Sequence, residues 1–199
     1  ERKFSEIVSM AILIKDGSNS EKSGPFGVSN LVGRMLSEGT MSRSSKDISE
    51  QIEFLGAGLN VSVGREHITL STEVAKNRWF DVFEILSDIV MNPKFSKHEL
   101  RRIKDLELIK MKRSEENPNF VASRVVREIL FKDFEGLSKP IFGDKSYIED
   151  ITPEILSSRY SEIISHENLS LLFVGNISSD EINTKSQLSG CINDARNLK

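Results

Sequence analysis

Histidine spacing is the first test for a metal or acid–base centre, and the local pattern in this sequence does not meet it. The chain contains three histidines, His67, His98 and His166. No two of them are four residues apart, so no helix can present two imidazoles to one zinc ion. We expect His67 at a hairpin turn, His98 in the first turn of a helix and His166 at a helix end, each solvated. Local spacing therefore predicts neither zinc binding nor histidine catalysis.

Other reactive residues offer no clearer chemistry. The single cysteine, Cys191, excludes an internal disulfide and a multi-cysteine zinc cluster, and it lies in a polar segment far from any nucleophile partner. The sequence has no Gly-x-Ser-x-Gly elbow, no phosphate-binding Gly-x-x-x-x-Gly-Lys loop and no dinucleotide fingerprint. Glu115 and Glu116 are adjacent carboxylates, but they end a charged helix, where a solvated role is more common than acid–base work.

The elements that would position a site are indicated by hydrophobic period and turn residues. In the first half we expect a strand over residues 7–14, a helix from Gly27 closed by Gly39, a shorter helix opened by Ser44 or Ser45 and ended by Gly56, and a hairpin over residues 59–74. In the second half we expect a helix over residues 79–90, a helix opened by Ser96 with Leu100, Ile103, Leu106 and Ile109 inward, a helix from Asn117 to about Phe131, a loop over 132–150, a helix from Thr152, a strand over 169–174 and no element beyond Ile177. This order predicts an α+β domain with helices layered on one face of a mainly antiparallel sheet.

Composition and charge limit the classes of partner that the protein is expected to bind. Hydrophobic residues make up 38% of the chain, enough for a core, and the formal net charge is −3. Because Lys and Arg alternate with Asp and Glu, we expect no nucleic-acid partner and no attraction to anionic membranes. The longest strongly apolar run, residues 7–14, is too short for a membrane span. The compartment stays unknown; we expect a soluble protein, with the cytoplasm slightly favoured over the periplasm or the mitochondrial matrix.

Several longer motifs occur in a fixed order along the chain. They lie at residues 27–40, 52–60, 65–67, 86–95 and 147–176. Together they resemble the pitrilysin/insulinase family of zinc peptidases, which includes mitochondrial processing peptidase and the core proteins of respiratory complex III. The resemblance covers about residues 7–180 and implies the metallohydrolase-like fold of that family.

The first of these motifs resembles the family's zinc-binding helix, but its chemistry is missing. In active members the helix carries His-x-x-Glu-His, whose first, fourth and fifth positions share one face. The corresponding residues here are Asn30, Gly33 and Arg34. Asparagine is a poor zinc ligand, glycine has no side chain to act as a base, and a guanidinium repels a divalent metal. The resemblance therefore implies no catalytic residue and no zinc in this chain.

The family's third zinc ligand is a glutamate from a later helix. It maps near Lys110 and Met111, with Glu107 one turn away if the register slips. One carboxylate could not rescue the site. We expect Asn30 to face a cleft, where its truncation would change stability little.

The other two motif positions allow ordinary structural interpretations. Gly33 is explained by close helix packing. Arg34 is either a solvated or salt-bridged surface residue or has a specific role in an interdomain cleft.

The resemblance implies that the protein functions together with a partner subunit or domain rather than alone. The first hypothesis is a non-catalytic subunit or domain that pairs with a zinc-bearing family partner and helps to enclose and bind an extended peptide. The alternative is a structural scaffold like the complex III core proteins, with no peptide substrate. A third hypothesis, an active peptidase with atypical ligands, lacks a convergent ligand set. We expect residues 1–180 to form one domain of a longer multidomain chain, and residues 181–199 to be a polar tail or the start of a linker.

Overall fold

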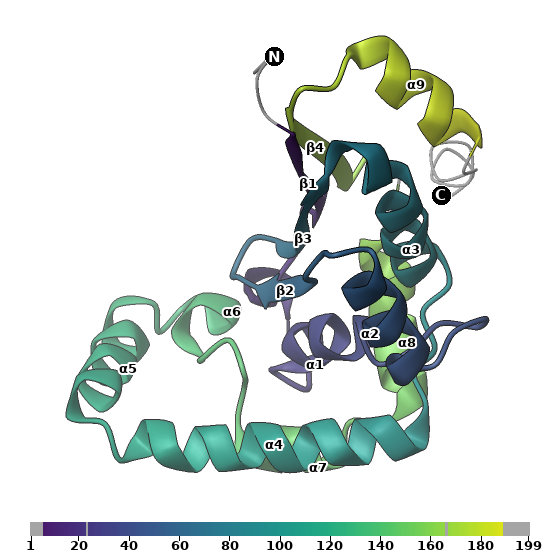
Figure 1. Cartoon of the computed structure of the whole chain (residues 1–199). Coiled ribbons are helices and arrows are strands. Elements are labelled where there is room, and N and C mark those ends of the chain that lie inside the picture. The colour runs from purple at the N-terminus through teal and green to yellow at the C-terminus, as the bar shows by residue number, and fades with distance from the viewer. Residues whose placement is uncertain (1–5, 23, 166, 189–199) are drawn as a thin grey trace.

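One antiparallel sheet organises the structure. The computed structural model describes residues 6–22, 24–165 and 167–188. The four strands found there are β1 (Ile7–Ile14), β2 (Asn60–Val63), β3 (Ile68–Ala75) and β4 (Leu169–Gly175). Their order in the sheet is β2-β3-β1-β4, with every neighbouring pair antiparallel (Figure 1). Strands from opposite ends of the described chain, β1 and β4, are therefore neighbours.

One face of this sheet is buried and the other is not. The buried side chains of the two central strands are Val8, Met10, Ile12, Ile14, Ile68, Leu70, Thr72 and Val74. The residues that alternate with them, such as Ser9 and Glu73, keep part or much of their surface exposed. A period of two is what strand geometry requires when helices cover a single face. The predicted α+β class, with helices layered on one face of an antiparallel sheet, is confirmed.

The core helices come from both halves of the chain. They are α1 (Val28–Leu36), α2 (Ser45–Phe54), α3 (Trp79–Met91) and α8 (Pro153–Ile163), which lie together in Figure 1. Short 3₁₀ turns at Ser18–Ser20 (η1) and Lys76–Arg78 (η2) precede α1 and α3. As predicted, Ser44 opens α2; its hydroxyl and the Asp47 carboxylate form a capping box.

A second group of helices extends from the core. The long helix α4 (Lys97–Glu115) runs along the side of α1 away from the sheet, and α5 (Pro118–Leu130) follows it (Figure 1). The Asn117 side chain accepts hydrogen bonds from the backbone N–H groups of Asn119 and Phe120, so the predicted start of α5 is confirmed.

The buried face of α4 differs from the prediction. Leu106 and Ile109, expected to point inward, are exposed. The buried side chains of this helix are Leu100, Ile103, Glu107 and Met111. Their spacing is helical, but a search for apolar residues passes over Glu107, because carboxylates are rarely buried.

Three helices were missed by the sequence analysis. The segment 132–150, expected to be a loop, contains α6 (Glu135–Ser138) and α7 (Lys145–Asp150), and α9 (Ser179–Leu188) lies beyond Ile177. Helices α6 and α7 have four and six residues, too few to display a hydrophobic period. Helix α1 also ends earlier than expected. Its last residue is Leu36, and Gly39, at φ 139°, belongs to the turn that forms a β-bridge with Ser44.

Two of the three histidines can be placed. His67 and His98 are exposed, as predicted. His166 and Cys191 lie outside the described residues. No described helix is both long enough and apolar enough to cross a membrane.

Candidate functional site

Helix α1 lies where the sheet hairpin and α4 meet. It contacts β2, α4 and α8. Its apolar side chains Leu31, Val32, Met35 and Leu36 are fully buried. The degenerate motif residues Asn30, Gly33 and Arg34 belong to the same helix, so one short helix carries both core packing and the candidate site.

A buried carboxylate from α4 meets the motif residues. Glu107 is 3% exposed. Its Oε2 accepts a hydrogen bond from Asn30 Nδ2 at 3.0 Å, and its Oε1 lies 3.3 Å from Arg34 Nε. Lys110, one turn further along α4, donates from Nζ to Oε1 at 2.8 Å. The four side chains form one network, which we call the Glu107 cluster (Asn30, Arg34, Glu107 and Lys110).

The Glu107 cluster corrects the expectation for Asn30, and it agrees with one of the alternatives left open for the later glutamate and for Arg34. Asn30 does not face an open cleft; it is 6% exposed and hydrogen-bonded. The glutamate that faces α1 is Glu107, one turn before the mapped positions. Lys110 lies at the solvent-exposed rim of the cluster, and Met111 packs in the core. Arg34 is salt-bridged and partly exposed.

The side chains present do not fit a zinc ion. The described residues contain no group of three or more His, Cys, Asp or Glu side chains that could hold a metal. The carboxylate of Glu107 already faces an amide and two cations. A divalent metal beside Arg34 would be repelled by the guanidinium and would lack imidazole ligands. We therefore derive no catalytic step through a metal here.

Gly33 is explained by contact with the hairpin. A Cβ at this position would lie 2.3 Å from Val63 Cγ2 and 3.3 Å from Ile68 Cγ2. Valine is stiff about χ1, so its methyl group cannot easily move away. The packing interpretation of Gly33 is confirmed, and the space that a catalytic base would occupy is filled by β2.

The amino-terminal end of α1 is held by residues that the sequence analysis did not identify. The Glu21 carboxylate accepts hydrogen bonds from the backbone N–H groups of Gly27 and Ser29, at 2.8 and 2.7 Å. It therefore caps a helix whose N-cap residue, Gly27, has no side chain to do so. Burial raises the pKa of Glu21, although both backbone N–H groups favour its charged form.

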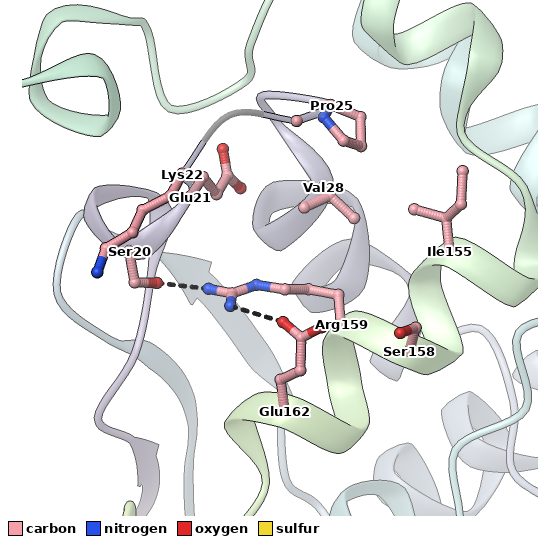
Figure 2. A pocket seen from close by; sticks show the side chains of 10 residues that line it. Ser20, Glu21, Lys22, Pro25, Val28, Ile155, Ser158, Arg159 and Glu162 are labelled. Atoms are coloured by element: carbon pink, nitrogen blue, oxygen red, sulfur yellow. Dashed lines mark hydrogen bonds and ion pairs between the residues drawn. The ribbon is translucent and has the colours of Figure 1, made fainter.

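Arg159 of α8 fastens the same region from the other side (Figure 2). Its guanidinium donates to Asp16 Oδ1 at 2.9 Å and to Ser29 Oγ at 3.1 Å, and also contacts Ser20 and Glu162. Arg159, Ser20 and Glu162 border a cavity of about 460 Å³. Because Asp16, Ser20 and Ser29 lie far from Arg159 in the sequence, no local pattern could have indicated these contacts.

Comparison with known proteins shows which family the chain belongs to. The family model described as insulinase (peptidase family M16) matches residues 1–145. The chain belongs to this family of peptidases.

Two relatives and one solved structure illustrate the similarity. An uncharacterised zinc protease of Rickettsia felis is 27% identical over 90% of this chain and 43% of its own length. The probable mitochondrial-processing peptidase subunit beta of Arabidopsis thaliana is 24% identical over 87% of this chain and 32% of its own length. A crystal structure of a peptidase M16 inactive domain from Pseudomonas fluorescens has a TM-score of 0.87 and 22% identity, covering 96% of this chain and 47% of that one. The chain thus spans less than half the length of each.

The Gly33 contact predicts a coupling between α1 and β2. Gly33→Ala should destabilise the fold by roughly 1–3 kcal/mol through overpacking, although alanine is the better helix former. Val63→Ala should relieve the clash, so the double variant should cost less than the sum of the single variants. Urea denaturation of the four proteins measures this. Gly58→Ala is the control, since a Cβ there meets no atom within 4 Å. Strictly additive costs would contradict the contact.

The buried cap predicts a specific pH dependence. Because the folded-state pKa of Glu21 is raised above its ordinary value of 4.5, its contribution to stability is fully present below that value and is lost as pH rises through the folded pKa. Glu21→Gln keeps an acceptor oxygen without the buried charge. The stability of this variant relative to wild type should therefore increase as urea melts are moved from pH 4.5 to pH 8. A difference that is constant or decreases over this range would show that Glu21 has no raised pKa.

Proposed function

We propose that this chain is a non-catalytic domain of a peptidase assembly, which pairs with a zinc-bearing subunit or sister domain of the same family and helps to bind an extended peptide. The observation that carries the proposal is the Glu107 cluster: in a fold shared with family members, the motif positions bind a carboxylate from the same chain instead of forming a metal site. Zinc and the activated water would come from the partner alone.

The greater length of the relatives supports the existence of a partner domain. The relatives that match most of this chain are more than twice as long as the matched part. The matched region in each of them therefore adjoins a further region of comparable length. We infer that this domain works against another domain, either in the same chain or in a second subunit.

A peptide site is supported by the free edge of β2. This strand pairs with β3 on one side, and no described strand pairs with the other side. Two of its four residues, Asn60 and Ser62, are exposed. An extended peptide could add to this edge through main-chain hydrogen bonds, which supply affinity without requiring one sequence. The other edge strand, β4, is less suitable because it is separated from α1 by the width of the sheet.

The proposal predicts that this chain contributes to peptide cleavage only when it is combined with its zinc-bearing partner. Each family member from the same genome that retains an intact His-x-x-Glu-His motif should be co-expressed with this chain. The correct partner should co-purify with it, and the pair should cleave an extended peptide several-fold faster than either protein alone, in a reaction that a chelator stops.

The control is this chain with the cluster intact but the edge hindered by a proline inserted in β2, checked for folding by its melting temperature. Full activity of the partner alone, unchanged by added chain, would contradict peptide binding by this domain. Co-purification without any effect on hydrolysis would favour the structural scaffold.

A further inference from the structure

The charges of the Glu107 cluster do not balance. Glu107 contributes one negative charge, while Arg34 and Lys110 contribute two positive charges. No other carboxylate of the described residues lies within 4.0 Å of either cation. The cluster therefore carries one uncompensated positive charge.

That excess charge faces solvent, whereas the carboxylate does not. The side chains of Arg34 and Lys110 are 42% and 50% exposed, against 4% for Glu107. Lys110 uses one donor on Glu107. Arg34 approaches Glu107 only through Nε and donates no hydrogen bond to any described residue. Its guanidinium thus keeps the planar pair of donors that binds a carboxylate in bidentate fashion.

The positions of Arg34 and Lys110 relate them to the free edge of β2, the proposed peptide-binding edge. Arg34 follows Gly33, whose backbone lies against Val63 of β2, and Lys110 comes from α4 on the other side of α1. Arg34 therefore lies one residue from the contact between α1 and the edge strand β2, and Lys110 is close to Arg34 because both contact Glu107 Oε1. Side chains of an added strand alternate between the two faces of the sheet, so every second residue of a bound peptide would point towards α1.

We propose that Arg34 and Lys110 form a carboxylate-binding subsite, which gives the peptide edge a preference for a substrate that carries an acidic side chain or a free C-terminal carboxylate at this point. The inference rests on the proposed peptide-binding function and specifies its substrate class. In place of a metal that polarises a peptide bond, the degenerate motif offers a fixed cation that positions a peptide.

The preference can be tested first with the wild-type chain, before any variant is made. The probe is a neutral eight-residue host peptide of alternating valine and threonine, N-terminally labelled with a neutral fluorophore. One set has a C-terminal amide and a single Glu scanned through every position, a matched set has Gln instead, and a third peptide has no Glu but a free C-terminal carboxylate. Binding is measured by fluorescence anisotropy with the chain in its co-purified complex, at low and high salt.

We expect at least one carboxylate peptide to bind about tenfold more tightly than its neutral match, the size of one charge-assisted hydrogen bond, with the advantage reduced by salt. An advantage for internal Glu identifies an acidic side chain as the ligand, and an advantage for the free C-terminus identifies a terminal carboxylate; either outcome supports the subsite.

Variants then assign the effect to the two cations. Arg34→Gln should abolish the carboxylate preference and leave binding of the neutral peptide unchanged, and Lys110→Gln should reduce the preference. Lys112→Gln is the matched control, since it removes the same charge from an exposed position of α4 that does not contact Glu107. If Arg34→Gln fails to fold, Arg34→Lys keeps the charge but loses the planar fork and should weaken the preference.

The possible failures are distinguishable. Equal binding of carboxylate and neutral peptides by the wild type would overturn the subsite and leave the peptide-binding function standing. Loss of the preference in Lys112→Gln as well as in Arg34→Gln would reduce it to general electrostatic attraction and would also overturn the subsite. No binding of any peptide in the series would overturn the subsite together with the function on which it rests.

Discussion

A buried carboxylate needs partners, and this requirement fixes how α1 and α4 lie against each other. Moving an unpaired charge into a protein interior is far more costly than any single packing defect. Glu107 is almost completely buried, and its partners come from both helices: Asn30 and Arg34 from α1, and Lys110 from α4 itself. Sliding one helix by a turn would leave the carboxylate without its amide and guanidinium. The cluster therefore replaces, as a structural link between the two helices, what a shared metal ion does in zinc proteins.

Gly33, which shares a face of α1 with Asn30, imposes a second constraint. Gly33 allows the helix backbone to approach Val63 so closely that a Cβ would clash. The same residue type that cannot act as a base thus makes the contact between α1 and β2 possible. The apolar residues of α1 remain in the core, so the helix keeps its structural part while the polar positions lack the chemistry of a zinc peptidase. Fold and catalysis are separable here because they depend on different faces of one helix.

The regular elements could be predicted from sequence because their signals are local. A run of apolar residues indicated β1, and alternating apolar residues indicated β3. The caps predicted at Ser44 or Ser45 and at Asn117 marked helix starts correctly. The degenerate positions Asn30, Gly33 and Arg34 were identified through the resemblance to the family's zinc-binding helix. What could not be predicted depends on contacts between distant segments. The burial of Asn30 follows from Glu107, which lies 77 residues further on, and Arg159 reaches Ser29 across 130 residues. No period or motif reports such pairs, and the exposure of Ile109 reflects where α1 happens to meet α4.

We propose that the Glu107 cluster takes the place of a metal at the motif positions. The most direct measurement is elemental analysis of the purified chain after incubation with zinc and exhaustive dialysis, with the Glu107→Gln variant in parallel. We predict no stoichiometric zinc in either protein, because one carboxylate engaged by an amide and two cations cannot hold the ion. One tightly held zinc per wild-type chain, lost in Glu107→Gln, would contradict the non-catalytic assignment.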